Sequence, residues 1–429
     1  MRYFDVPRHV YLHVPFCARR CSYCDFSIAV RRTVPVEEYC AALASELAIR
    51  FPDRGQSQWG QSQWGQSQWG QSQWGQSQWG QSRWGQSRWG QSRWGQSQDS
   101  DPNPAEENST EVDTIYLGGG TPSRLGGAGV ARALGLVRER FPLAPAAEVT
   151  IEANPDDITE AAVEAWLEAG VNRLSIGSQS FDDAVLAWMH RTHEGSGIER
   201  AVAVARSAGI TNLSLDLIFA LPEELRRDFA ADLDRLLALD PDHVSLYGLT
   251  VEQGTPLGRW VSRGKTAERG EEGYEAEYLA AHEALTTAGL EHYEVSNYAR
   301  PGKRSRHNAS YWRGVPYVGL GPAAHGFEGR IRRWNARAYT DWRDLVAHGL
   351  DPVAGEEELT EQNRLAESVY LGLRTDAGLP LEEGERDLVD PWEVAQWVTI
   401  GADDRLRCTA LGWLRLDSLA AALTHSRSR

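Results

Sequence analysis

Short runs of β-branched and apolar residues alternate with longer amphipathic stretches over residues 9–249. Six runs have the length and composition of buried strands: HVYLHV (9–14), VDTIYLGG (112–119), EVTIEAN (148–154), NRLSIGS (172–178), NLSLDLIF (212–219) and HVSLYGL (243–249). The stretches between them, such as TEAAVEAWLEAG (159–170) and IERAVAVARSAG (198–209), have helical periodicity. This alternation predicts an α/β fold in which crossover helices connect parallel strands.

Polar residues cluster just after the predicted strands. Three cysteines follow the first strand, GGGTPS (118–123) follows the second, and Glu152 and Gln179 close the third and fourth. Asp216 lies within the fifth strand. The strand ends of a barrel converge on one mouth, whereas those of an open doubly wound sheet are spread along a line. We therefore expect a partial (β/α)6 barrel of the TIM type rather than an open sheet.

The pattern changes beyond residue 270. A predicted helix (271–289) is followed by mixed short segments that include the Gly-rich YVGLGPAAHGF (317–327). From about residue 358, helical runs lead into LRCTALGWLRLDSLAAALT (406–424). We expect the barrel over residues 1–51 and 112–270, an α+β extension of the barrel over 271–357, and a small winged-helix-like helical module over 358–429.

Residues 55–94 repeat the unit GQSQW five times and then GQSRW three times. A period of five gives no stable apolar face, because successive Trp side chains rotate by about 140° on a helix and alternate faces on a strand. We interpret residues 52–111 as a low-complexity insertion that stays disordered. The alternative is that the Trp side chains form a platform for a ring-shaped ligand or a partner protein.

Charge and composition exclude some classes of function. The chain has 60 acidic and 44 basic residues and no Lys/Arg block that could follow a phosphate backbone, so we expect no nucleic-acid partner. It has no signal-peptide pattern and no run of 18 apolar residues, so we expect a cytoplasmic protein. Five cysteines do not make a disulfide framework, and we expect Cys40 and Cys408 to be structural.

The other three cysteines, Cys17, Cys21 and Cys24, lie within eight residues of YLHVPFCARRCSYCDF (11–26). Three thiolates on one loop can hold three irons of a [4Fe–4S] cluster and leave the fourth iron open to a small molecule. The alternative is a zinc site that is completed by a distant residue such as His13 or Cys40. The cysteine spacing alone leaves both kinds of metal site open.

The polar residues at the strand ends suit a ligand that joins a zwitterionic amino acid to a nucleoside. Gly119 and Gly120 let the backbone approach such a ligand closely, and Thr121 adds a polar contact. The other candidates are two carboxylates, one amide and one guanidinium: Glu152, Asp216, Gln179 and Arg191. Each of them alone could be a structural polar group, but together they favour a cofactor pocket.

The sequence resembles a known family. YLHVPFCARRCSYCDF looks like the CxxxCxxC signature of the radical S-adenosylmethionine (SAM) enzymes. YLGGGTPS, IEANP, NRLSIGSQSF, SLDLIFALP and EHYEVSNYAR resemble successive blocks of the oxygen-independent coproporphyrinogen III oxidases and their relatives, and the likeness covers nearly the whole chain except the Trp repeat. The resemblance implies that the partial barrel is a radical SAM barrel.

The resemblance also implies cofactors and their contacts. A [4Fe–4S] cluster is expected on Cys17, Cys21 and Cys24, with SAM on the open iron and an electron donor such as flavodoxin if the cluster is redox-active. The positions that match the family's SAM contacts are Tyr11, Tyr23, Gly119, Gly120, Thr121, Glu152, Gln179, Arg191 and Asp216.

Two features distinguish branches of this family. The true oxidases carry an extended segment before the signature and a further cysteine two residues past the third, where this chain has Phe26. RHNASYW (306–312) is similar to the HNxxYW box of the HemW haem chaperone branch, which is associated with haem binding, and the C-terminal module resembles that branch too. Read without the resemblance, His307 and Asn308 are turn residues, and Tyr311 and Trp312 pack a nearby core.

The resemblance to that branch implies a haem chaperone. Its expected haem contacts are His307, Asn308, Tyr311 and Trp312, and its expected partners are haem and membrane haem proteins such as respiratory enzymes, so that contact with the membrane is transient. A homodimer is left open. The alternative is an active radical SAM enzyme, either a coproporphyrinogen III oxidase or another porphyrin-modifying relative, and we expect no coproporphyrinogen oxidase activity.

Overall fold

The computed structural model describes residues 7–52 and 111–428. The predicted low-complexity insertion at 52–111, with its Trp repeat, therefore falls almost entirely outside the described residues. Within the described part, no helix is both long enough and apolar enough to cross a bilayer.

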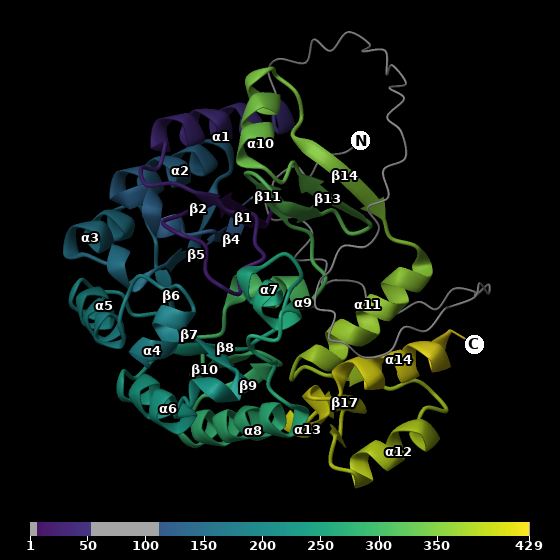
Figure 1. Cartoon of the computed structure of the whole chain (residues 1–429). Coiled ribbons are helices and arrows are strands. Elements are labelled where there is room, and N and C mark those ends of the chain that lie inside the picture. The colour runs from purple at the N-terminus through teal and green to yellow at the C-terminus, as the bar shows by residue number, and fades with distance from the viewer. Residues whose placement is uncertain (1–6, 53–110, 429) are drawn as a thin grey trace.

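A nine-stranded sheet forms the centre of the protein, with the order β11-β1-β4-β5-β6-β7-β8-β10-β9 (Figure 1). In chain order, the first six strands of this sheet are β1 (His9–Val14), β4 (Val112–Gly119), β5 (Leu143–Ala153), β6 (Arg173–Gln179), β7 (Leu213–Phe219) and β8 (His243–Gly248). These six are neighbours in chain order and are all parallel. This arrangement confirms the predicted partial (β/α)6 barrel.

Three further strands extend the sheet at its two ends. On one side β11 (Val318–Leu320) pairs with β1 in parallel, and on the other β10 (Asn297–Ala299) and β9 (Glu291–Glu294) continue from β8 as antiparallel strands. The edges of the sheet are therefore β11 and β9.

Helices cover the outer face of the barrel, where Figure 1 shows them as an arc around the strands. They are α1 (Val36–Arg50), α2 (Gly126–Arg140), α3 (Glu160–Glu168), α4 (Asp183–Trp188), α5 (Gly195–Ser207), α6 (Phe229–Ala238) and α8 (Glu271–Thr287). Side chains cap some of these helices: Thr159 accepts a hydrogen bond from the Ala162 amide at α3, and Asp228 accepts one from the Ala231 amide at α6. The predicted strand and helix alternation thus becomes one layer of strands inside one layer of helices.

The two faces of the barrel strands differ in polarity. Parallel strands covered on both sides are commonly apolar throughout, but here most alternate residues are polar. Apolar positions such as Leu12, Leu117 and Ile151 belong to the core that packs against the helices. The intervening positions hydrogen-bond to each other across neighbouring strands, as Tyr116 does with Glu152. Because side chains on a strand alternate between faces, the inner face of this barrel is polar.

At the start of the strands, the inner face contains a chain of buried hydrogen bonds. Thr114 Oγ1 lies 2.9 Å from His9 Nδ1 and 2.7 Å from His307 Nδ1, and His307 Nε2 lies 2.8 Å from the Tyr311 hydroxyl. Burial lowers the pKa of His307 well below its usual value and that of His9 to about 4, so both rings are neutral at pH 7. The chain therefore connects four polar side chains, three of them buried, without a charge.

Two short helices lie on either side of α8 in the chain. They are α7 (Pro256–Ser262) and α9 (Arg306–Trp312). The segment that follows α9 contains α10 (Tyr339–Ala347) and an antiparallel sheet of β12 (His325–Phe327), β13 (Ile331–Asn335) and β14 (Val353–Glu358). The buried carboxylate of Glu46 on α1 connects this segment to the barrel, because it accepts hydrogen bonds from Trp342 Nε1 and the Gly321 amide.

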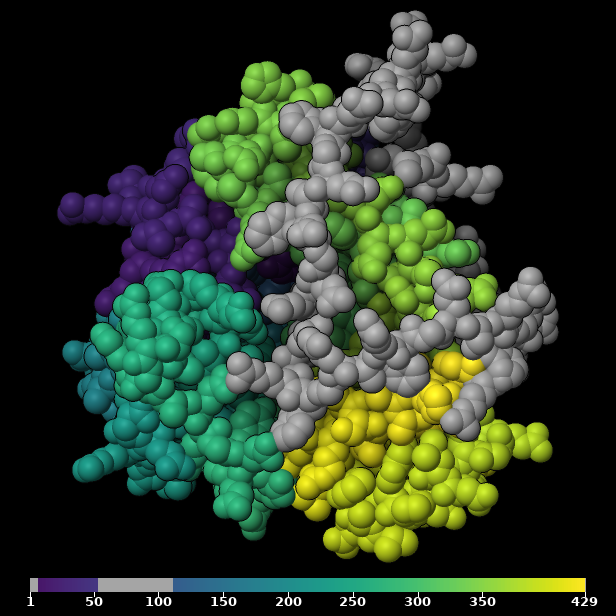
Figure 2. All heavy atoms as spheres, turned by 45° about the vertical axis from the view of Figure 1, so that its right-hand side comes forward, coloured from purple at the N-terminus to yellow at the C-terminus, as the bar shows by residue number. Residues whose placement is uncertain are grey.

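The C-terminal part combines four helices with a small antiparallel sheet. Its elements are α11 (Glu361–Arg374), α12 (Arg386–Val394), α13 (Ala410–Trp413), α14 (Leu416–Arg427), β15 (Leu379–Pro380), β16 (Val398–Ile400) and β17 (Arg405–Cys408). This composition agrees with the predicted winged-helix-like module, which lies beside the barrel end in the space-filling view (Figure 2). Trp413 anchors the module, since its ring contacts His292 at 4.2 Å and its Nε1 donates to the Leu373 carbonyl.

Two isosteric substitutions test the polar inner face. Thr114→Val should lower the free energy of unfolding by about 2–4 kcal/mol, because it leaves two buried histidine nitrogens unsatisfied. Thr150→Val is the matched control: Thr150 is equally buried on β5, and its hydroxyl makes no hydrogen bond within the described residues, so the cost should stay under about 1 kcal/mol. Urea unfolding measures both, and equal losses would contradict the assignment of the hydrogen-bond chain.

Candidate functional site

The three clustered cysteines lie on the loop that follows β1. Cys17 ends the short strand β2 (Phe16–Cys17), and β3 (Ala29–Val30) pairs with it after the loop has returned. Backbone hydrogen bonds from Ser22 to Met189 and from Leu257 to Ser22 hold the loop against two other segments. All three thiols are free, and the loop is therefore folded around them without a disulfide.

The protein surroundings of two of these thiols, Cys17 and Cys24, favour the protonated form. Burial raises the pKa of the Cys17 thiol, and it raises that of Cys24 to about 12. A bound metal has the opposite effect, because coordination deprotonates a thiol. Two polar groups touch the sulfurs: Thr121 Oγ1 lies 3.4 Å from Cys17 Sγ, and Arg191 Nη1 lies 3.6 Å from Cys21 Sγ. Both contacts stabilise negative charge on sulfur, as thiolates that bind an iron–sulfur cluster require.

The zinc alternative receives no support from the described residues. Nowhere among them do three or more His, Cys, Asp or Glu side chains converge on a point that one ion could occupy. His13 has its Nδ1 3.1 Å from the Tyr11 hydroxyl and its Nε2 3.1 Å from the Ser27 carbonyl oxygen. Cys40, a residue of α1, is fully buried in the core. A [4Fe–4S] cluster needs no common point, because each thiolate binds a different iron.

The glycine loop after β4 is pressed against the start of the cysteine loop. A Cβ atom on Gly119, which has a φ of +112°, would lie 2.5 Å from the His13 ring, and one on Gly120 would lie 2.6 Å from the Pro15 carbonyl carbon. Only glycine allows this close approach. The approach brings Thr121 to Cys17, so the two loops that were predicted to meet do so.

Two carboxyl groups face the inside of the barrel near this loop. Glu152 accepts hydrogen bonds from the Tyr116 hydroxyl at 2.8 Å and from the Gly119 amide at 3.1 Å. Burial raises its pKa to about 7. Asp216 accepts a hydrogen bond from Ser175 at 3.1 Å, and burial raises its pKa to about 6. Two buried carboxyl groups of this kind favour a ligand that carries a positive charge or a hydroxyl group.

Arg191 is the centre of the polar contacts on the other side of the cysteine loop. Its Nη2 donates to Asn154 Oδ1 and to the Gly177 carbonyl, both at 2.7 Å, while its buried Nε has no partner within the described residues. Gln179 ends β6 with a φ of +70°, at an irregularity in the pairing with β7. A Cβ on Gly177 would lie between the Gln179 amide and Arg191, so these two side chains flank the same position.

The two tyrosines of the predicted site lie in different surroundings. Tyr11 stacks on Tyr116, with ring centroids 6.3 Å apart, on the inner face of the barrel. Tyr23 packs on the small apolar cluster that contains Val185 and Met189, beside the cysteines. The structure therefore places the cysteines, the glycine loop, Glu152 and Gln179 at or just beyond the carboxyl ends of the strands, whereas Tyr11 and Asp216 lie within β1 and β7.

The HNASYW segment lies at the other end of β4. It forms helix α9 rather than the turn of the plain interpretation, and His307 is fully buried with both ring nitrogens hydrogen-bonded. Thr114 and Gly119 are five residues apart on β4, which is roughly 17 Å along a strand. The structure thus does not bring His307 to the cysteines, although the His307 ring stacks on Tyr116, which in turn stacks on Tyr11.

Comparisons with known proteins agree with this geometry. The family model of the radical SAM superfamily matches residues 105–236. The "Heme chaperone HemW" of Mycobacterium tuberculosis is 34% identical over 423 residues, which cover 97% of this chain and 95% of that protein. The protein of the same name from Synechocystis is 34% identical over 87% of this chain and 79% of its own length. This chain belongs to the HemW family.

Other relatives support the family fold. The mitochondrial "Radical S-adenosyl methionine domain-containing protein 1" of mouse is 30% identical to this HemW-family chain, and the match covers 96% of this chain and 86% of the mouse protein. The solved structure of coproporphyrinogen III oxidase (HemN) from Escherichia coli matches 99% of the chain with a TM-score of 0.72 and 20% identity. At that identity the match shows the fold. Membership of the radical SAM superfamily implies a [4Fe–4S] cluster and SAM.

Two groups of residues in this HemW-family site escaped the sequence-based prediction. Asn154, which follows the third predicted strand, is not among the predicted contacts, and its Oδ1 accepts a hydrogen bond from Arg191. Tyr116 and Thr114 were not considered, although they connect the two ends of the barrel interior. The signal that could have found them is the polar residue at every second position of each predicted strand.

The raised pKa of Glu152 predicts a pH dependence of stability. A carboxyl whose folded pKa is about 7, against 4.5 for the free group, stabilises the apoprotein fully below pH 4.5 and loses this contribution as the pH rises through 7. Glu152→Gln cannot titrate, so the variant should lose less free energy of unfolding than the unmodified protein between pH 5 and pH 8. Denaturant unfolding across this range measures it. Glu164→Gln, at an exposed position on α3, is the control and should keep the original profile.

Proposed function

We propose that this protein is a haem chaperone, which binds haem and passes it to membrane haem proteins such as respiratory enzymes. The observation that carries the proposal is the likeness to proteins named heme chaperone HemW over almost the full length of both chains. Cytoplasmic location with transient membrane contact, an electron donor such as flavodoxin, and a homodimer remain predictions.

The proposed cofactors are a [4Fe–4S] cluster on Cys17, Cys21 and Cys24 and SAM beside it. The free thiols and the guanidinium of Arg191 next to Cys21 support the cluster. The proposed SAM contacts are Tyr11, Tyr23, Gly119, Gly120, Thr121, Glu152, Gln179, Arg191 and Asp216. When bound, a reduced cluster supplies the electron that cleaves SAM in enzymes of this superfamily. The residues of this chain would orient SAM and exclude water.

The proposed haem contacts are His307, Asn308, Tyr311 and Trp312. The burial of His307 sets a condition on this part of the proposal: direct ligation of iron by its ring requires that the bond to Thr114 or to Tyr311 is broken. Trp312 is half-buried, and the guanidinium of Arg374 covers its ring at 4.0 Å. Haem that reaches these side chains must therefore displace contacts of α9.

An active coproporphyrinogen III oxidase is the second candidate, because the fold matches that of such an enzyme over 99% of the chain. Phe26 argues against oxidase activity. This residue stands where the oxidases have a further cysteine, and its side chain is 60% exposed beside the cluster loop. Anaerobic incubation of the reconstituted protein with coproporphyrinogen III and a reductant separates the two functions. We expect no vinyl products, and stoichiometric vinyl formation would contradict a function limited to haem transfer.

Iron content tests the cluster. Anaerobically reconstituted protein should contain about four irons per chain and should be brown. Replacement of Cys17, Cys21 or Cys24 by Ser should remove most of this iron, because each thiolate holds a separate iron. Cys408→Ser, at a buried cysteine outside the loop, is the matched control and should retain the cluster. A colourless unmodified protein that contains zinc would contradict the assignment.

Haem titration tests the HNASYW contact. His307→Ala should weaken haem binding and change the absorption spectrum of the complex. His348→Ala, at an exposed histidine that follows α10, should bind haem like the unmodified protein. Because His307 is buried, circular dichroism of both variants must first show an intact fold. Unchanged affinity and spectrum in a folded His307→Ala protein would show that His307 is no haem contact.

A further inference from the structure

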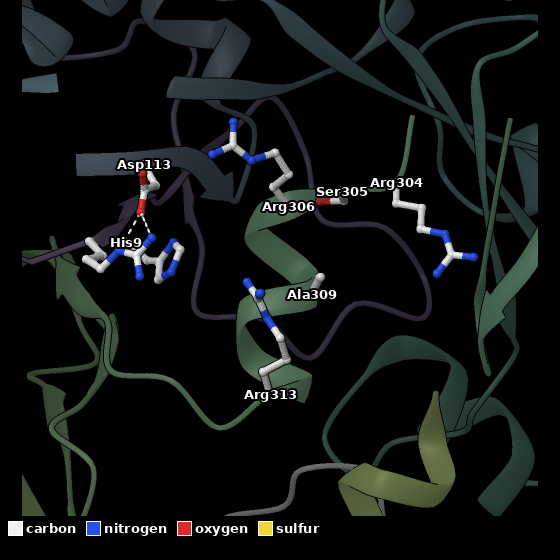
Figure 3. Close-up of a pocket in the computed structure, with 8 residues that line it drawn as sticks. His9, Asp113, Arg304, Ser305, Arg306, Ala309 and Arg313 are labelled. Atoms are coloured by element: carbon white, nitrogen blue, oxygen red, sulfur yellow. Dashed lines mark hydrogen bonds and ion pairs between the residues drawn. The ribbon is translucent and has the colours of Figure 1, made fainter. Parts of the chain in front are cut away.

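A cavity of about 290 Å³ lies against helix α9, at the end of the barrel away from the cysteines. Four arginines line it, together with His9 and Asp113: Arg8, Arg304, Arg306 and Arg313. In Figure 3, α9 stands in the centre of the view, with His9 and Asp113 on one side of it and Arg304 on the other. This concentration of positive charge contrasts with the formal net charge of −16 for the whole chain.

The four arginines differ in how far the protein already neutralises them. Arg8 forms an ion pair with Asp113 at 2.5 Å, and Arg304 pairs with Glu291 and Asp376. Arg306 donates to a backbone carbonyl, which leaves its charge uncompensated. The guanidinium of Arg313 has no ion pair or hydrogen bond within the described residues, whereas the backbone amide of this residue donates to the Ala309 carbonyl. The cavity therefore keeps two cationic side chains that are free to bind an anion.

Helix α9 directs these side chains by its periodicity. Arg306, Ala309 and Arg313 are three and four residues apart and so share one face of the helix. His307 and Ser310 occupy the buried face. Ala309 has a short side chain between the two arginines, which leaves room above the helix for a ligand group. One helix thus presents the HNASYW histidine to the barrel interior and two arginines to the cavity.

A second observation at the cavity is independent of the arginines. His9 is 5% exposed and lines the cavity, and its Nδ1 bonds to Thr114. Its Nε2 has no partner within the described residues. The ring is neutral, since burial and the nearby charges of Arg8, Arg306 and Arg313 lower its pKa to about 4. A buried, neutral ring with one nitrogen unpaired can donate a hydrogen bond to an anion from that nitrogen.

We propose that this cavity, the arginine pocket, binds the carboxylates of the two haem propionates. The inference rests on the proposed function and adds the part of haem that the protein holds. At about 290 Å³ the pocket falls just below the usual range for a whole small-molecule ligand, so it accommodates the carboxylate edge of the macrocycle rather than the ring itself. Guanidinium groups bind carboxylates in bidentate geometry, and Arg306 and Arg313 are the free pair.

The hydrogen-bond chain connects the arginine pocket to the HNASYW motif. Thr114 has one hydroxyl proton, so the chain has two polarities. In one, the Tyr311 hydroxyl donates to His307, His307 donates to Thr114, and Thr114 donates to His9 Nδ1. The proton of His9 then lies on Nε2, where it donates to a carboxylate in the pocket. An anion selects this polarity, and His307 acts as a positioning residue for His9.

Haem and its dimethyl ester, titrated in the same detergent buffer, test the pocket. The full-length protein should bind haem about tenfold more tightly than the ester, because a hydrogen bond to a charged group contributes about 1.5–3 kcal/mol. Arg313→Ala should weaken the binding of haem about tenfold and leave that of the ester within twofold. Arg364→Ala, at an exposed arginine on α11, is the matched control and should change neither. Arg313→Glu should weaken haem binding further.

The outcomes separate the inference from the proposed function. If the unmodified protein binds neither haem nor the ester, the proposed function is wrong. If it binds both equally well and Arg313→Ala changes neither, haem binding stands and the pocket assignment is wrong. Glutarate is a third ligand: at millimolar concentration it should compete with haem and not with the ester. If glutarate raises the melting temperature of the unmodified protein but not of Arg313→Ala, and leaves haem binding unchanged, the pocket serves a free dicarboxylate instead of haem.

Discussion

The need to satisfy polar groups on the inner face of the barrel governs this structure. Six parallel strands place polar residues inward at most of the alternate positions, while their apolar residues pack against the outer helices. A buried polar group without a hydrogen bond costs about 1–3 kcal/mol, and most inward side chains have a partner on a neighbouring strand or on a segment that closes the barrel, although the Thr150 hydroxyl has none within the described residues. The pairs Tyr116–Glu152, Ser175–Asp216 and Ser214–His243 meet this need within the sheet.

The same constraint explains why α9 closes the barrel at the strand starts. His307 on α9 supplies the partner for Thr114, and Glu148 on β5 accepts hydrogen bonds from the amides of His307 and Arg306. The stacked rings of His307, Tyr116 and Tyr11 then continue from α9 towards the glycine loop. A substitution or a bound ligand at one end of the barrel therefore alters the contacts of these stacked rings, which extend to the other end. This contact gives the proposed chaperone a physical route by which haem and the cluster region influence each other.

Sequence reasoning predicted the parts of the fold that depend on local pattern. The strands and helices follow from runs such as HVYLHV and TEAAVEAWLEAG, and the barrel follows from polar residues at consecutive strand ends. The glycine loop and the cysteine loop meet as predicted, because parallel register brings their strand ends together. The burial of His307 could not be predicted from the local pattern, because it depends on a hydrogen bond to Thr114, which is 193 residues away in the sequence. The arginine pocket is of the same kind, because Arg8 and Arg313 are 305 residues apart in the sequence and meet only in the folded chain.

The central claim is that the protein carries haem and gives it up to an acceptor. It is tested most directly by mixing the haem-loaded, cluster-containing protein with membranes that hold a haem-free respiratory enzyme and following the haem absorption of both fractions. The account predicts that haem leaves the protein and appears in the membrane enzyme, which becomes active. It is contradicted if the haem stays on the protein, or if free haem at the same concentration activates the enzyme equally fast.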